Sequence, residues 1–303
     1  MLTAERLTGK GSSFGTFGEL LQGVLEDGTD FLVTFPIECY ANALFIVDAE
    51  DEDLTVFPPY KKKSRQLASY ILQHYALPIR GRLVLDGQLP IGKGFASSSA
   101  DLVSTARAIA NCYGLTFSDS LLEYWMGRIE PTDGVMYPGA VSFYHRRVQL
   151  REYLGDLPSL TVVALDEGGE VDTVEFNKIR KPFDSSEKKE YRELLNRLTA
   201  AIKLRDMHVI GEVATRSSIM NQKLRPKEHL DAVLALSRKI SGLGVAVAHS
   251  GTCLGILLSN DSPNYQKQLI QACDGLYDIG GNVGVFQSWK SKAGKERGYH
   301  GIF

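Results

Sequence analysis

The 303-residue sequence predicts an α+β fold, with strands and helices mixed from one end of the chain to the other. Two patterns support this prediction. Apolar runs such as 43–47 and 245–248 have the length of buried strands, whereas other segments repeat apolar residues at helical spacing. The length is also ample for a sizeable core and suggests about two domains.

In the first part of the chain we expect strands over 31–36 and 43–47. Pro36 should end the first of them, and the acidic run 48–53 should end the second. A helix is expected over 62–75, because its apolar residues recur every three or four positions.

A strand over 82–86 should lead through a Gly-rich turn into a helix over 97–113, which a glycine stops. A second helix is expected over 118–127, capped by its first serine or by the aspartate that follows. Segments 141–144 and 148–153 read as the two strands of a hairpin.

A domain boundary is expected near 155–158, which divides an N-terminal domain (1–156) from a C-terminal domain (157–303). The second half reads as a strand, three helices, two strands, a helix and a strand, again an α+β pattern. These elements are expected at 160–165, 187–204, 207–223, 228–240, 244–248, 253–258, 263–274 and 283–288. The basic tail 290–299 is expected to be solvated.

Composition argues against several classes of protein. The 34 Lys and Arg residues are balanced by 36 Asp and Glu, a net charge of −2, which disfavours nucleic-acid binding through a bulk positive field. No apolar run approaches the ~18 residues of a membrane span, and the N-terminus lacks the apolar core of a secretory signal. The four cysteines are widely spaced and predict neither a zinc site nor a disulfide framework. We therefore expect a cytoplasmic protein.

The most informative segment is the Gly-rich turn 89–94 with the helix that follows it. Gly92 and Gly94 allow backbone angles that can aim several N–H groups at one anion. The helix adds unpaired N–H groups and the positive end of its dipole, and the serines 97–99 add hydroxyls for phosphate or Mg²⁺. The alternative interpretation is a glycine turn followed by a serine helix cap. The spacing fits neither a Walker A loop nor a dinucleotide fingerprint.

A second candidate is the loop 128–134, which carries two acids, Glu130 and Asp133, on either side of a Pro-Thr pair. A loop between a helix and a strand can point one carboxylate at a metal and the other at a substrate hydroxyl. The alternative is an ordinary proline-containing turn.

Two further segments are candidates for contact with phosphate or substrate. A small polar turn at 248–251 lies between two apolar strands and could close over a phosphate, although a simple hairpin turn would look the same. Glu19, in the segment 14–23, could equally belong to a plain loop.

In their order along the chain, these four segments resemble those of the GHMP kinase superfamily. The phosphate-loop pattern of that superfamily is roughly P-x-G-x-G-L-G-S-S-A-A. The matching residues are Pro90, Gly92, Gly94, Ser97, Ser98 and Ala100, and Phe95, Ala96 and Ser99 are conservative departures. Segments 17–23, 130–133 and 248–251 are most similar to the L-threonine kinase branch, which is linked to cobalamin synthesis and propanediol use. Many superfamily members have a lysine where this sequence has Ser13.

The resemblance implies the GHMP kinase fold, with an N-terminal half like ribosomal protein S5 domain 2 and a ferredoxin-like C-terminal half. ATP would lie between the halves, with its phosphates over 92–99. The implied activity is in-line transfer of the γ-phosphoryl group of ATP, with Mg²⁺ as cofactor, to the hydroxyl of a small metabolite. A hydroxy amino acid is the first expectation. We expect no nucleic acid or membrane as partner, and a homodimer is left open.

The resemblance also implies roles for individual residues. Ser98 and Glu130 are assigned to Mg²⁺, with Glu123 as an alternative ligand, and Asp133 is the candidate base or orienter for the attacking hydroxyl. The expected ATP-binding residues are Pro90, Gly92, Lys93, Gly94, Phe95, Ala96, Ser97, Ser98 and Ser99. The expected substrate contacts are Glu19, Thr132, His249, Ser250 and Gly251. Two other interpretations stay open, namely a kinase for a non-amino-acid alcohol and a nucleotide-binding relative without catalysis.

Overall fold

The structure is a computed structural model that describes residues 6–170, 179 and 181–291. The described strands are β1 (Leu7–Val24), β2 (Asp30–Val47), β3 (Leu54–Phe57), β4 (Gly81–Gly87), β5 (Ala140–Tyr144), β6 (Gln149–Gly155), β7 (Leu160–Asp166), β8 (Gly244–Val247), β9 (Cys253–Ser259) and β10 (Val283–Gln287). The described helices are α1 (Lys62–His74), α2 (Ser97–Tyr113), α3 (Asp119–Gly127), α5 (Ser185–Leu204), α6 (Met207–Asn221), α7 (Leu230–Lys239) and α8 (Tyr265–Gly280). This mixture confirms the predicted α+β class.

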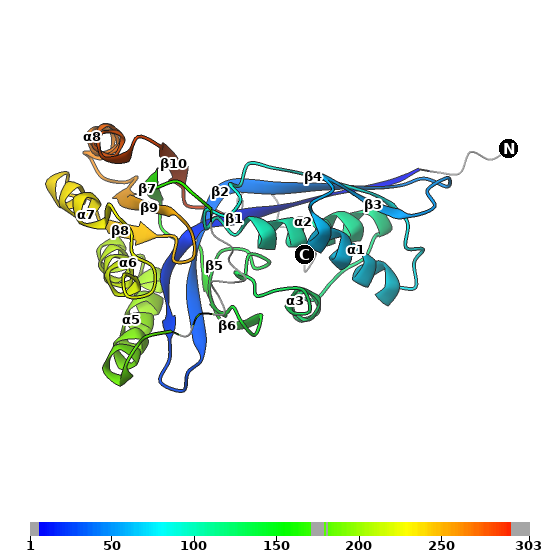
Figure 1. Cartoon of the computed structure of the whole chain (residues 1–303), viewed down its shortest axis with the longest axis horizontal. Helices are drawn as coiled ribbons and strands as arrows, with labels where there is room; N and C mark the ends of the chain where they lie inside the picture. Colours follow the sequence, from blue (N-terminus) through cyan, green and yellow to red (C-terminus); the bar gives the residue numbers. More distant parts are fainter. Residues whose placement is uncertain (1–5, 171–178, 180, 292–303) are drawn as a thin grey trace.

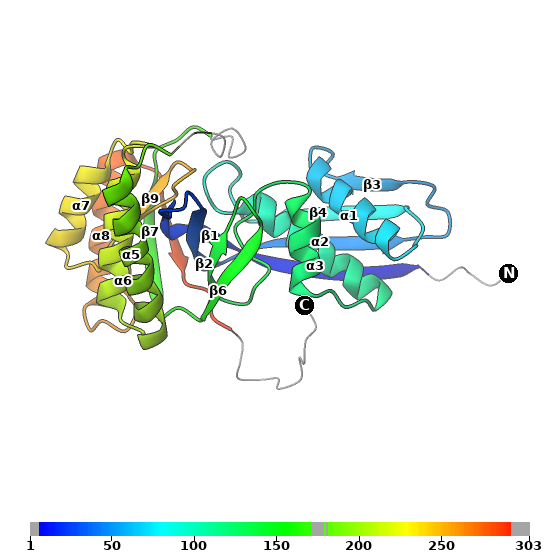
Figure 2. The same ribbon diagram turned by 90° about the horizontal axis from the view of Figure 1, so that it is seen from below.

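A single sheet connects both halves of the chain in the described residues. Its strand order is β10-β7-β9-β8-β1-β2-β4-β3, and the hairpin of β5 and β6 branches from β2. Helices α1, α2 and α3 cover one face of the N-terminal part, whereas α5 to α8 form a layer against the C-terminal part (Figures 1 and 2). The sheet is continuous across the expected boundary at 155–158, and the division into two domains stays a prediction.

The main departure from the predicted elements is the pair of 18-residue strands β1 and β2, which run antiparallel through the centre of the molecule. We expected two strands separated after Pro36, which was wrong, and no strand was predicted over the segment that forms β1. Pro36 lies opposite Thr16, in a stretch where the register between the strands shifts several times. An irregular ladder of this kind tolerates a residue without an N–H group, so β2 continues through its proline and bends with β1 (Figure 1).

The other predicted elements are present with small shifts at their ends. Strand β3 was not predicted, since it has only four residues and follows the acidic run directly. Helix α8 extends to Gly280 instead of ending near 274. Most of the tail predicted at 290–299 lies outside the described residues. In the part of the chain that the structure describes, none of the helices combines the length and apolar character needed to cross a membrane.

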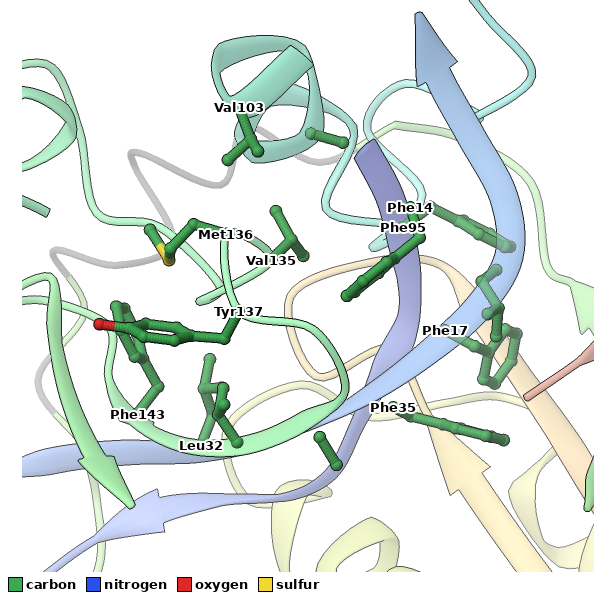
Figure 3. Close-up of a cluster of buried hydrophobic side chains, with 14 of the residues drawn as sticks. Phe14, Phe17, Leu32, Phe35, Phe95, Val103, Val135, Met136, Tyr137 and Phe143 are labelled. Carbon is green, nitrogen blue, oxygen red and sulfur yellow. The ribbon is translucent and has the colours of Figure 1, made fainter. Parts of the chain in front are cut away.

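Two groups of buried side chains fix the Gly-rich turn and the loop that carries Glu130 and Asp133 (Figure 3). Phe95, from the Gly-rich turn, packs between Phe17 of β1 and Phe286 of β10, with ring centroids 5.6 and 5.0 Å away. Beyond the loop of Glu130 and Asp133, a second group is formed by Val135, Met136, Tyr137, Phe143 and Leu32, all of them buried. Burying several large side chains stabilises each loop end by several kcal/mol, on the order of 1.5–3 kcal/mol per side chain.

Candidate active site

The described residues enclose a pocket of about 600 Å³ at the point where β1, the start of α1, the Gly-rich turn and the loop 130–133 meet. Its walls carry most of the residues singled out from the sequence. They are joined by residues from α1 and by the end of β5. The pocket wall includes Glu19, Gln22, Lys63, Gly92, Gly94, Ser97, Ser98, Ser99, Glu130, Asp133, His145 and Ser250.

The Gly-rich turn is held from behind through its carbonyl groups. The oxygens of Lys93, Gly94 and Phe95 accept hydrogen bonds from backbone N–H groups of Thr252, Gly18 and Thr16, at 3.3, 2.8 and 3.2 Å. Helix α2 then starts, and the N–H groups of its first turn have no partner within the helix. Carbonyls turned away and N–H groups left free make this wall of the pocket suited to an anion.

Gly94 and Gly251 allow the turn to pack directly against the hairpin turn between β8 and β9. Gly94 has a φ of +90°, and a Cβ added there would lie 2.4 Å from the Cβ of Ala248. A Cβ on Gly251 would lie 2.0 Å from the backbone oxygen of Lys93. No larger residue fits either position without moving the backbone, so the two turns form one rigid unit.

Ser98 and Glu130 meet in the pocket, as the sequence predicted for a metal site. The Ser98 hydroxyl donates to Oε1 of Glu130, and the Lys63 ammonium pairs with Oε2 of the same carboxylate. The alternative ligand Glu123 does not line the pocket. Its Oε1 accepts from the Tyr137 hydroxyl at 2.8 Å and from the backbone N–H of Leu150 at 2.6 Å, which holds it against the β5–β6 hairpin.

Lys63 is a site residue that the sequence reasoning missed. It belongs to a run of three lysines, 61–63, at the N-terminus of α1, whose first turn contains no acidic residue. Cations at this end oppose the helix dipole, so the run does not stabilise the helix. Instead, Lys61 pairs with Asp101 and Lys63 pairs with Glu130. Three lysines at the start of a helix are unfavourable for the helix itself, and this feature of the sequence could have indicated that they bind carboxylates elsewhere.

Asp133 lies in the pocket next to the serine run. The Ser99 hydroxyl lies 3.3 Å from both Oδ2 and the backbone nitrogen of Asp133. Burial of the carboxyl, and then the nearby carboxylates of Glu19 and Glu130, raise the pKa of Asp133 to about 7. Near neutral pH the side chain can therefore exchange a proton with a bound group.

Asp133→Asn is expected to stabilise the fold in a pH-dependent way. Because the folded-state pKa is raised above the ordinary value of 3.8, the ionised carboxylate costs stability as pH rises from about 4 to about 7. Because the pocket admits solvent, the loss of stability is smaller than the pKa difference alone would give. We expect about 1–2 kcal/mol. Thermal melts without Mg²⁺ should show a Tm gain of about 2–5 °C at pH 8 and none at pH 4. An equal Tm difference at both pH values would contradict this account.

Glu19 and His249 form a buried pair at the base of the pocket. Nδ1 of His249 lies 2.9 Å from Oε2 of Glu19, and Nε2 lies 2.8 Å from the Ser217 hydroxyl. Glu19 lines the pocket, whereas His249 lies behind it, so the histidine orients the carboxylate from outside the cavity. The sequence reasoning expected both to contact substrate.

Several other predicted site residues also lie outside the pocket wall. Thr132 is buried, and its backbone N–H donates to the carbonyl of His145 at 3.2 Å. Pro90 is exposed on the outer side of the turn.

The ammonium of Lys93 is directed to Asp166, 2.8 Å away, and to the carbonyl of Gly169. Gly251 has the packing role described above, and only Ser250 of its turn reaches the pocket.

Comparison with known proteins agrees with the resemblance seen in the motifs. The family described as "GHMP kinases N terminal domain" matches residues 63–140. L-threonine kinase from Citrobacter freundii is 29% identical over 249 residues, which cover 80% of this chain and 84% of the relative.

Solved structures share the fold across nearly the whole chain. Mevalonate kinase from L. major, solved in complex with R-mevalonate, superposes with a TM-score of 0.70 at 16% identity and covers 94% of this chain and 97% of its own. Homoserine kinase from Cytophaga hutchinsonii gives a TM-score of 0.68 at 17% identity, covering 93% and 94%. The chain therefore contains a GHMP kinase N-terminal domain at 63–140 and shares the fold of solved GHMP kinases, and its similarity to L-threonine kinase indicates an ATP-dependent phosphotransferase that acts on a hydroxyl group.

Proposed function

We propose that this kinase uses ATP and Mg²⁺ to phosphorylate the hydroxyl of a small hydroxy amino acid, with L-threonine as the first candidate acceptor. The observation that carries the proposal is the meeting of two polar pairs in one pocket. Ser98 contacts Glu130 and Ser99 contacts Asp133, at the N-terminus of one helix. The similarity to an L-threonine kinase over most of the chain supports the choice of acceptor.

The triphosphate of ATP would lie over the Gly-rich turn and the first turn of α2. Backbone N–H groups and the helix dipole favour negative charge there. Two exposed apolar side chains, Tyr60 and Ile91, border the same pocket with 63% and 51% of their surface accessible. They are suited to cover the flat face of a purine, because aromatic and aliphatic surface gains most from contact with a large apolar ring.

Ser98 and Glu130 fit a Mg²⁺ site, because this ion prefers oxygen ligands and usually takes only one or two carboxylates from the protein. Held by these two residues, Mg²⁺ would supply positive charge to neutralise the negative charge of the phosphates during transfer. Lys63 adds a mobile positive charge beside the same carboxylate and can pair with a phosphate oxygen.

Asp133 would receive the acceptor hydroxyl. An alcohol is a poor nucleophile near neutral pH, so a carboxylate that orients it or takes its proton lowers the barrier. Ser99 holds Oδ2 of Asp133 by a hydrogen bond, which limits the rotation of the carboxyl. Glu19 lines the same pocket and offers the negative charge that the ammonium of an amino acid requires.

Ser98→Ala and Glu130→Gln are each expected to raise the Mg²⁺ concentration needed for half-maximal activity by about 10–100-fold. Each substitution removes an oxygen ligand or its charge, a loss on the order of 1.5–3 kcal/mol. The measurement is a Mg²⁺ titration at saturating ATP. Glu123→Gln is the matched control, because Glu123 is bonded outside the pocket and should leave the midpoint unchanged. A shifted midpoint in the control alone would move the ligand assignment to Glu123.

The acceptor is tested by a screen coupled to ADP release. L-threonine, L-serine and L-homoserine should be compared with alcohols that carry no amino group, each with and without enzyme. We expect the highest kcat/KM with one of the three amino acids. Binding of ATP combined with transfer only to an alcohol that is not an amino acid would overturn the proposed acceptor class, while the kinase assignment would stand.

A further inference from the structure

His145 is a buried side chain at the pocket for which the kinase mechanism above has no role. It follows β5 directly, has 2% of its surface exposed, and lines the pocket. Neither ring nitrogen has a hydrogen-bond partner among the described residues. The second buried histidine near the pocket, His249, has both nitrogens bonded, to Glu19 and to Ser217. A buried polar group without a partner costs on the order of 1–3 kcal/mol, so an imidazole with two unpartnered nitrogens in the wall of a pocket points to a ligand that completes it.

The backbone of His145 is hydrogen-bonded to the loop that carries Glu130 and Asp133. Its carbonyl accepts from the N–H of Thr132, which lies between Glu130 and Asp133. The next residue, Arg146, pairs with Asp30 at the start of β2, with Nε 3.2 Å from Oδ2. These two contacts fix the backbone at His145 relative to the loop that carries Asp133. A group bound by His145 is thereby oriented for reaction at Asp133.

Gln22 is a second incompletely bonded side chain in the same pocket. It is 7% exposed, and its Oε1 has no hydrogen-bond partner in the described part of the chain. Strand register brings it near His145. Gln22 lies opposite Leu32 of β2, and Leu32 lies opposite Phe143 of β5, two residues before His145. Glu19 lies three residues before Gln22 on β1, and the register of β1 shifts between Glu19 and Leu21, so both side chains line the cavity together with His145.

The charges around these three residues are divided in sign. Burial, followed by the nearby cations Lys181 and Arg146 and by His249, lowers the pKa of His145 to about 3, so its ring is neutral and offers one N–H donor. A single N–H donor of this kind suits an oxygen of a ligand carboxylate. Glu19 and Oε1 of Gln22 instead offer a carboxylate and a carbonyl oxygen, which suit a cation with several N–H donors.

We propose that His145 determines acceptor specificity by donating its ring N–H to the α-carboxylate of an amino-acid acceptor, while Glu19 and Gln22 receive its ammonium group. This inference rests on the proposed function, since it assigns the residues that recognise the two charged groups of the acceptor. The assignment also explains why the enzyme would prefer an acceptor that carries both a carboxylate and an ammonium group. A site built to bond both groups leaves buried polar atoms unpaired when either group is missing, and such sites reject the incomplete ligand strongly.

The test compares L-threonine with two analogues that each lack one group. 1-Amino-2-propanol is threonine without its carboxylate, and 3-hydroxybutyrate is threonine without its amine. His145→Phe keeps a flat ring but removes both nitrogens. We expect it to lower kcat/KM for L-threonine by about 10–100-fold and to change kcat/KM for 1-amino-2-propanol by less than about threefold. The preference for the carboxylate should therefore nearly disappear, with ATP affinity unchanged.

Gln22→Leu should show the opposite selectivity. It should reduce the preference for L-threonine over 3-hydroxybutyrate and keep the preference over 1-amino-2-propanol. This variant tests the proposal even if His145→Phe does not fold. His145→Asn and His145→Gln place an amide near Nδ1 or Nε2, and one of them should restore part of the lost preference. His208→Phe, at an exposed position on α6, is the matched control for the substitution itself.

The outcomes separate this inference from the proposed function. If the wild type phosphorylates L-threonine and His145→Phe retains the full preference over 1-amino-2-propanol, His145 does not bind the carboxylate, while the proposed function stands. If the wild type binds ATP but transfers to no amino acid, the proposed function and the inference are both wrong. A loss that is equal for all three acceptors would show a merely structural role for His145 and would also overturn the inference.

Discussion

Asp133→Asn is expected to slow phosphoryl transfer by ~10²–10⁴-fold while leaving ATP affinity within about twofold of the wild type. Asparagine keeps the shape of the side chain and its contact with Ser99, but it has no negative charge and cannot take the proton of the hydroxyl. The proposed nucleotide contacts are on the Gly-rich turn, whose backbone is held independently by β1 and by the turn after β8. The chemical step should therefore be lost without loss of binding.

The measurement is single-turnover transfer with L-threonine, L-serine and L-homoserine, alongside ATP binding by calorimetry. Asp261→Asn is a suitable control, because this aspartate is exposed beyond the end of β9 and outside the pocket. Transfer by Asp133→Asn at the wild-type rate would remove Asp133 from the mechanism. The nearby carboxylates Glu19 and Glu130 would then be the next candidates for the base.

Gly94→Val is expected to weaken ATP binding by at least tenfold while the rest of the fold survives. The new Cβ would lie 2.4 Å from the Cβ of Ala248 and 3.2 Å from the Cα of Gly251, so the turn has to move away from the hairpin that supports it. Valine also resists the φ of +90° at this position. Movement of the turn would displace the N–H groups that face the phosphates, and affinity should fall with them.

Gly28→Val separates this effect from the general cost of positive φ. Gly28 lies in the turn between β1 and β2 with a φ of +85°, and no atom lies within 4 Å of its added Cβ. It should therefore lose stability through backbone strain without losing ATP affinity. Calorimetry with ATP on both variants, together with thermal melts, decides the question. Equal ATP affinity in Gly94→Val and wild type would reject the Gly-rich turn as the phosphate site.

Local chemistry in the sequence was enough to single out residues that line one pocket of the structure. Gly92 and Gly94 before a serine-rich helix start predicted a turn suited to an anion, and the structure has a turn there with both glycines at positive φ. The pairing of Ser98 with Glu130 came from a resemblance in motif order, and the two side chains meet in the pocket. Such features are predictable because they depend on a few adjacent residues and on the hydrogen bonds that a helix end leaves open.

Other features depended on pairings between distant segments, which local patterns do not encode. Strand β2 passes through Pro36 because β1 and β2 shift register there, and no property of the segment itself reveals the partner strand. Lys63 reaches Glu130 because α1 packs beside the loop, and Glu123 is drawn away by Tyr137.

The two histidines illustrate the same limit. The sequence alone favoured His249, which lies in a recognisable motif, and passed over His145. The fold gives both nitrogens of His249 to Glu19 and Ser217, and leaves those of His145 without a partner among the described residues. Residue type and neighbours along the chain determined which chemistry was available to this protein. Which side chains remain unpaired and face the cavity was decided by tertiary packing alone, because burial and the direction of each side chain follow from contacts between segments far apart in sequence.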